Sequence, residues 1–102
     1  MDEFERQWRS ALSEMDALGI RTGRMLQQIE KHGALKTAKY YLQRRRQSDG
    51  FAELAARGRL ELSMEALVVK GQFGVLFSDE EVNACFAQLC AAGYYGAATA
   101  QF

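Results

Sequence analysis

Hydrophobic residues recur along this chain at the three- and four-residue spacing of an amphipathic helix. The first such stretch collects its apolar side chains on one helical face: Phe4, Trp8, Ala11, Leu12, Met15 and Leu18. Charged residues occupy the other face, and Gly19 follows, which is the residue type that most often ends a helix. The pattern therefore predicts a helix that ends near residue 19, with Trp8 in the core.

The same spacing predicts further short helices. The chain has no proline and nine glycines, so glycine must end its helices. We expect helices over 20–32, 34–46 and 64–69, the last capped by Ser63, and a short one that ends at Gly58. Because Arg45 would point into the apolar arc of the 34–46 helix, that helix is expected to fray or end about there. Ser78 and Glu81 have the spacing of a capping box. The helix behind that box is expected to end at Gly93 and to bury Val82, Cys85, Phe86 and Leu89.

The segment VVKGQFGVLF (68–77) leaves two alternatives open. Valine and phenylalanine favour strands, which would make a hairpin that turns at Lys70 and Gly71. Two helical pieces separated by a glycine fit the flanking caps better. We therefore predict an all-α fold, a compact single-domain bundle of five or six short helices over 1–95, with a loose tail at 96–102 and the hairpin as the alternative.

Composition indicates one ordinary globular domain. The 102 residues are 48% hydrophobic and 25% charged, and no apolar run approaches the roughly 20 residues needed to cross a bilayer. The N-terminus lacks the pattern of a signal peptide. Cys85 and Cys90 would point about 140° apart on a helix, so no disulfide between them is expected. Free thiols fit a reducing compartment, and we expect the cytoplasm of a bacterial cell.

Charge is sorted along the sequence although the formal net charge is zero. Residues 1–20 carry two arginines and five acids, residues 21–59 carry ten basic residues and three acids, and residues 60–102 carry one lysine and five acids. Such a concentrated basic block is typical of a surface that contacts something acidic.

The basic block peaks on and after the third predicted helix. The side of that helix opposite its apolar arc carries Lys36, Lys39, Tyr40, Gln43 and Arg44, and Arg45 and Arg46 follow. These residues are candidates to contact phosphates or an acidic protein surface. The alternative is a solvated face, paired in part with the acidic ends of the same chain. Tyr94 and Tyr95 are further candidate contacts, because tyrosine is frequent at interface hot spots.

No residue pattern indicates catalysis, a metal or a cofactor. His32, the only histidine, stands near a predicted helix C-terminus, where the helix dipole favours a cation. Cys85 falls in a core stripe, and two cysteines with one distant histidine do not supply a structural zinc site. The acidic residues Glu61, Glu65 and 79–81 are explained by electrostatics at helix N-termini. We therefore expect a protein that is not an enzyme and has no cofactor.

Part of the chain, 33–95, resembles a poorly characterised bacterial module. The shared pattern is G-A-L-x-T-A-K-x-x-L, S-x-G-F, G-R-L-x-L-[ST]-x-E-A-L-V, L-F-[ST]-x-E-E and a closing G-Y. It is matched by Gly33, Thr37, Lys39, Ser48, Gly50, Phe51, Arg59, Leu60, Glu65, Leu76, Phe77, Glu80, Glu81, Gly93 and Tyr94. Gly71 stands where the pattern has proline. The resemblance implies an all-helical fold from bacteria or their mobile elements, and no reaction.

Two functions follow as hypotheses. The first is a protein-binding module, encoded by a phage or mobile element, that inhibits or regulates a bacterial defence complex by presenting its basic face to an acidic protein surface. The second is a nucleic-acid-binding protein that contacts phosphates with the same residues. No membrane partner is expected, and self-association is open because opposite charge blocks on one chain can pair across a two-fold axis.

Overall fold

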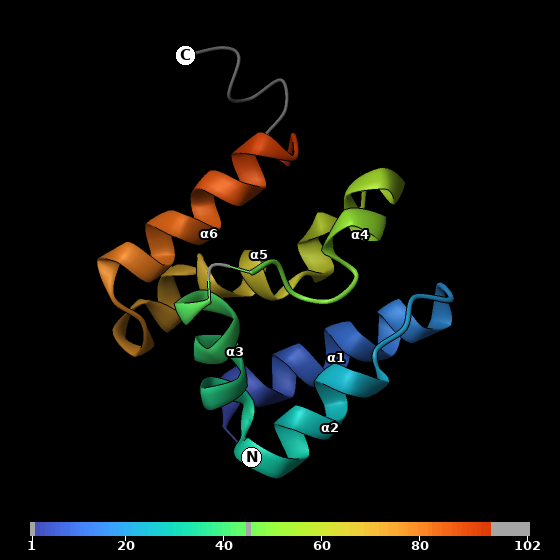
Figure 1. The fold of residues 1–102 in the computed structure, drawn as a ribbon, viewed down its shortest axis with the longest axis horizontal. Coiled ribbons are helices and arrows are strands. Elements are labelled where there is room, and N and C mark those ends of the chain that lie inside the picture. The colour runs from blue at the N-terminus through green and yellow to red at the C-terminus, as the bar shows by residue number, and fades with distance from the viewer. Residues whose placement is uncertain (1, 45, 95–102) are drawn as a thin grey trace.

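The computed structural model describes residues 2–44 and 46–94, and in this part of the chain every regular element is helical. The α-helices are α1 (Glu3–Ala17), α2 (Gly23–His32), α3 (Ala34–Gln43), α4 (Phe51–Arg57), α5 (Met64–Val68) and α6 (Asp79–Ala91). Two 3₁₀ helices, η1 (Leu60–Leu62) and η2 (Gly71–Leu76), complete the fold (Figure 1). The all-α prediction is confirmed. The hairpin alternative at 68–77 is wrong, because this segment forms the end of α5 and the whole of η2. The predicted tail, 96–102, lies outside the described residues.

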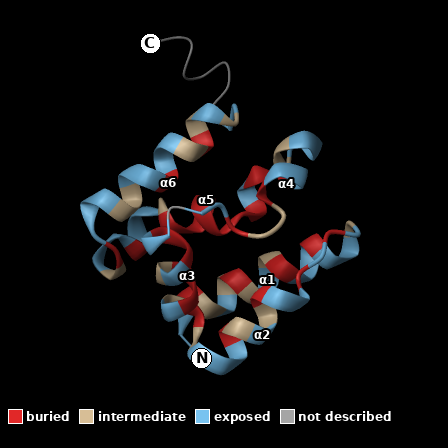
Figure 2. Cartoon of the chain, in the orientation of Figure 1, coloured by how far each residue is buried: buried red, intermediate tan, exposed pale blue. Residues whose placement is uncertain are grey.

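The shortest α-helix, α5, is the centre of the fold. All five of its residues are buried, and α1 and α6 both pack against it (Figure 2). α2 lies against both α1 and α3, while α4 packs on η1. A five-residue helix is too short to be stable alone. Its conformation therefore depends on the helices that cover it.

Aromatic packing closes the start of α1 over η2. The ring of Phe4 lies 5.2 Å from that of Phe73 in an edge-on arrangement, and 5.4 Å from that of Phe77. Its other neighbour is Trp8, which is 1% exposed. The predicted core position of Trp8 is confirmed. The contacts of Phe4 with Phe73 and Phe77 join segments about 70 residues apart in sequence, at centroid distances that edge-on and tilted aromatic pairs prefer.

The helix ends confirm most of the cap predictions. The hydroxyl of Ser78 accepts a hydrogen bond from the Glu81 amide, and the Glu81 carboxylate accepts one from the Ser78 amide. Ser63 caps α5 by accepting from the Ala66 amide at 3.0 Å. Gly58, which follows α4, has φ of +70°, a left-handed conformation that favours glycine. These local signals set the boundaries of the helices.

Two details of the helices differ from expectation. The third helix ends at Gln43, two residues before the end expected about Arg45, and the Arg46 amide donates to the carbonyl of Tyr41 in the turn that follows. Phe86 is 49% exposed rather than buried. α6 packs one face on α5 through Cys85 and Leu89, and Phe86 is rotated about 100° from Cys85 around the helix. No helix in the described ranges has the length and apolar character to span a membrane.

Candidate functional site

α3 carries an exposed stripe of residues four apart: Lys36, Tyr40 and Arg44. This spacing places them on one side of the helix. The guanidinium carbon of Arg44 lies 4.3 Å from the centre of the Tyr40 ring, and Tyr40 is 44% exposed. A cation–π contact of this kind at the surface contributes about 0.5–1 kcal/mol. The contact holds Arg44 against Tyr40 at the surface.

Lys39 differs from Lys36 and Arg44 because it forms an ion pair within the molecule. Its Nζ donates to Glu81 Oε1 at 3.0 Å and lies 5.3 Å from the centre of the Phe77 ring. Partial burial opposes the ionisation of Glu81, but hydrogen bonds from the Ser78 amide and Lys39 hold the pKa of Glu81 below its usual value. Lys39 therefore joins α3 to the start of α6. For this residue, the basic face is paired with an acidic residue of the same chain, which was the alternative to partner binding.

A groove of about 420 Å³ runs between α2 and α3 on the basic side. Its lining is Gln28, His32, Lys36, Thr37, Lys39, Tyr40 and Gln43. Gln28 and His32 are one turn apart on α2 and were not among the predicted contacts. The signal that could have placed them is Gly33, which separates α2 from α3 by a single residue and brings the two helices into contact.

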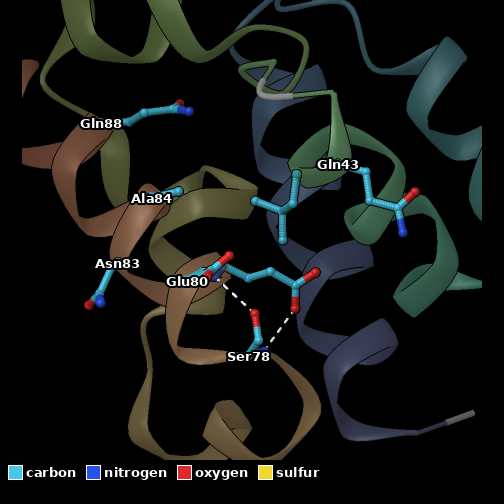
Figure 3. A pocket seen from close by; sticks show the side chains of 8 residues that line it. Gln43, Ser78, Glu80, Asn83, Ala84 and Gln88 are labelled. Carbon is cyan, nitrogen blue, oxygen red and sulfur yellow. Dashed lines mark hydrogen bonds between the residues drawn. The ribbon is translucent and has the colours of Figure 1, made fainter.

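A second groove, of about 900 Å³, lies between the end of α3 and α6 (Figure 3). Its lining is Leu42, Gln43, Ser78, Glu80, Glu81, Asn83, Ala84 and Gln88. Gln43 lines both grooves, so the two meet at the end of α3. The Glu80 side chain is exposed and forms no ion pair within the described part of the chain. One groove is therefore bordered by cations and the other by a carboxylate.

The remaining predicted contacts are distributed around this surface. Arg46 is exposed in the turn after α3. Tyr94 is 38% exposed and follows α6, a helix about 20 Å long whose other end contacts Lys39. Tyr94 is thus remote from the Lys39–Glu81 contact. Arg45 and Tyr95 lie outside the described residues.

A buried carboxylate anchors the turn that carries Arg46. Glu65 on α5 is fully buried and accepts two hydrogen bonds from Ser48, one from its amide at 2.8 Å and one from its hydroxyl at 2.7 Å. Burial raises the pKa of Glu65, against the effect of the Ser48 hydrogen bonds. From the sequence, Glu65 was expected only to stabilise the N-terminus of its helix electrostatically. Its burial follows from the position of α5 at the centre of the fold.

Cys85 and His32 lie in different environments, one buried and one exposed. Burial raises the pKa of the Cys85 thiol to about 12, so it is protonated at neutral pH. His32 is exposed at the end of α2. Within the described ranges, no group of three His, Cys, Asp or Glu side chains is placed to hold a metal ion. The arrangement that the described residues do present is a charged surface around Tyr40.

No protein-family model, curated protein or solved structure matches this chain.

Proposed function

We propose that this chain is a small non-enzymatic binding protein that presents the α2–α3 side to an acidic surface of a protein partner. The observation that carries the proposal is the exposed Tyr40–Arg44 pair beside a groove bordered by His32 and Lys36. Tyrosine and arginine are the residue types most enriched at interface hot spots. A stacked arginine loses less freedom on binding than a mobile one, which favours affinity.

Unpaired charge supports this choice of surface. Arg24, Lys39 and Arg59 of the central basic block form ion pairs with acids of the chain. Lys36, Arg44 and Arg46 form none within the described residues, and all three are exposed. Their charge is available to a partner. The groove beside them supplies polar groups that would add specificity to the electrostatic attraction.

The biological role that we propose is inhibition or regulation of a bacterial defence complex in the cytoplasm, by a phage or mobile-element protein. It rests on the resemblance of residues 33–95 to a bacterial module and on the zero net charge with a local basic face. An inhibitor of this kind needs only a binding surface.

Direct binding of nucleic acid is the second candidate. Lys36, Arg44 and Arg46 would contact phosphates, and Tyr40 would stack on a base. Salt separates the two candidates. Phosphate contacts release counterions, so the affinity for nucleic acid falls steeply with salt concentration, whereas a packed protein interface loses mainly association rate.

The test is a pull-down from bacterial lysate, with and without nuclease, using wild type and Lys36→Glu/Arg44→Glu. The matched control is Arg21→Glu/Arg57→Glu, which makes the same charge change at two exposed positions outside α3, one between α1 and α2 and one at the end of α4. Circular dichroism verifies that each variant is helical.

The proposal expects a protein that survives nuclease treatment and is lost with the α3 variant but kept with the control. Tyr40→Ala should also weaken the capture of this protein. Loss of a hot spot of about 2 kcal/mol would raise the dissociation constant about thirtyfold. Nucleic acid captured through the same residues would favour the second candidate. Equal behaviour of the two charge variants would refute both.

A further inference from the structure

We propose that a second copy of this chain docks on the surface where the two grooves meet, forming a weak two-fold dimer held by complementary charge. This inference goes beyond the proposed function and does not depend on it. Its basis is the order of four charged residues across that surface: Lys36, Lys39, Glu81 and Glu80.

The order follows from the contacts. Lys36 and Lys39 are one turn apart on α3 and both line the α2–α3 groove. Lys39 pairs with Glu81 at 3.0 Å, which crosses from α3 to the first turn of α6. Glu80 stands beside Glu81 in that turn and lines the α3–α6 groove. The surface therefore runs from two positive residues to two negative residues.

A two-fold rotation reverses this order. With the axis near the Lys39–Glu81 pair, Lys36 of one copy faces Glu80 of the other, and Glu80 of the first faces Lys36 of the second. Both contacts form at once, as an isologous interface requires. The Lys39–Glu81 pairs of the two copies lie together at the centre. There, each Lys39 is close to Glu81 of its own copy and to Glu81 of the other copy. The side chains of Lys39 and Glu81 are 33% and 18% exposed, so the pair is reachable from outside.

The charge of the whole chain fits this interface. The formal net charge is zero, so two copies approach without long-range repulsion. Tyr40 and Gln43 supply uncharged contact area beside the charged row, Tyr40 at 44% exposed. Exposed ion pairs contribute little each and are screened by salt. The dimer is therefore reversible and sensitive to salt, and it covers Lys36, so it competes with an acidic partner for the same face.

Charge reversal at the two ends of the row tests the dimer. Sedimentation equilibrium at low salt compares wild type with Lys36→Glu, with Glu80→Lys and with an equimolar mixture of these two variants. Each variant alone opposes like charges at both ends of the interface, so its dimer dissociation constant should rise about tenfold or more. In the mixture, each introduced residue meets an opposite charge, so a heterodimer of wild-type strength should form.

The control mixture is Arg21→Glu with Asp16→Lys, two exposed positions outside the row with the same changes of net charge. It should show no heterodimer stronger than the wild-type dimer. The proposal is overturned if wild type is monomeric at low salt, if the Lys36→Glu and Glu80→Lys mixture stays monomeric, or if each control variant loses the dimer as the row variants do. The proposed function would stand in any of these cases, because its own test measures capture of a different protein.

Discussion

Removing the hydroxyl of Ser48 should destabilise the protein, by an amount that depends on pH. Glu65 is fully buried, and Ser48 donates two hydrogen bonds to its carboxylate, one from the hydroxyl at 2.7 Å and one from the backbone amide at 2.8 Å. Ser48→Ala deletes the hydroxyl donor and leaves the amide. A hydrogen bond to a charged group contributes about 1.5–3 kcal/mol, so we expect the free energy of unfolding to fall by about 2 kcal/mol at a pH where the Glu65 carboxylate is ionised.

The pH dependence follows from the raised pKa of Glu65. Between the ordinary value of 4.5 and the folded value, the native state holds a proton that the unfolded chain has lost. The native state therefore binds more protons, and the contribution of this group to the free energy of unfolding falls as the pH rises through that window. Ser48→Ala removes one of the hydrogen bonds that favour the ionised form. Its destabilisation should therefore grow with pH, from about 1 kcal/mol where the carboxyl is protonated.

Urea unfolding measures this effect, with the fluorescence of Trp8 as the probe because it is the only tryptophan and is buried. Ser10→Ala, on the exposed side of α1, is the control and should change the free energy of unfolding by less than about 0.5 kcal/mol. In Glu65→Gln, the residue can no longer ionise. Relative to wild type, this variant should gain stability as the pH rises through the window. An effect of Ser48→Ala that equals the control, or that is the same below and above the window that the Glu65→Gln comparison locates, would refute the reasoning.

Three further outcomes are expected. Trp8→Ala should lower the free energy of unfolding by about 3–5 kcal/mol in urea denaturation, since it empties a fully packed aromatic site; a loss below about 1 kcal/mol would contradict the packing. Gly50→Ala should lower the melting temperature more than Gly58→Ala. Both glycines are left-handed, with φ of +84° and +70°, but an added Cβ would lie 2.8 Å from a side-chain carbon at Gly50 and meets nothing within 4 Å at Gly58. A maleimide should label one thiol of the native protein, Cys90, and label Cys85 only in denaturant, as read by intact mass; fast labelling of both thiols in the native protein would show that Cys85 is accessible.

Local sequence signals accounted for the class of fold and most helix ends. Ser63 and Ser78 cap helices, and Gly58 follows one, because each of these signals acts on backbone groups within a few residues. The burial of Trp8 followed from periodicity alone. The exposure of Phe86 did not follow from the sequence, because a helix whose apolar residues extend around its surface does not specify which side meets the core.

The candidate site was only partly contained in the sequence. Helical spacing alone predicted Lys36, Tyr40 and Arg44 on one exposed side of α3, and the structure has them there. The sequence did not show that His32 borders the same groove, because that contact depends on how α2 packs on α3. Nor did it separate Tyr94 from Lys39, since only the packing of the first turn of α6 on α3 places Tyr94 a helix length from that lysine.

The charged residues show most clearly which properties the sequence determines and which depend on the tertiary structure. The sequence by itself determined that basic residues are concentrated in the middle of a neutral chain, because charge counts require no geometry. Only the tertiary structure decided which charges are neutralised internally. It joins Lys39 to Glu81, 42 positions apart, and it buries Glu65 against Ser48, 17 positions away. The energy of a charge depends on its distance to other charges and on its exposure to water, and both are set by packing of the whole chain.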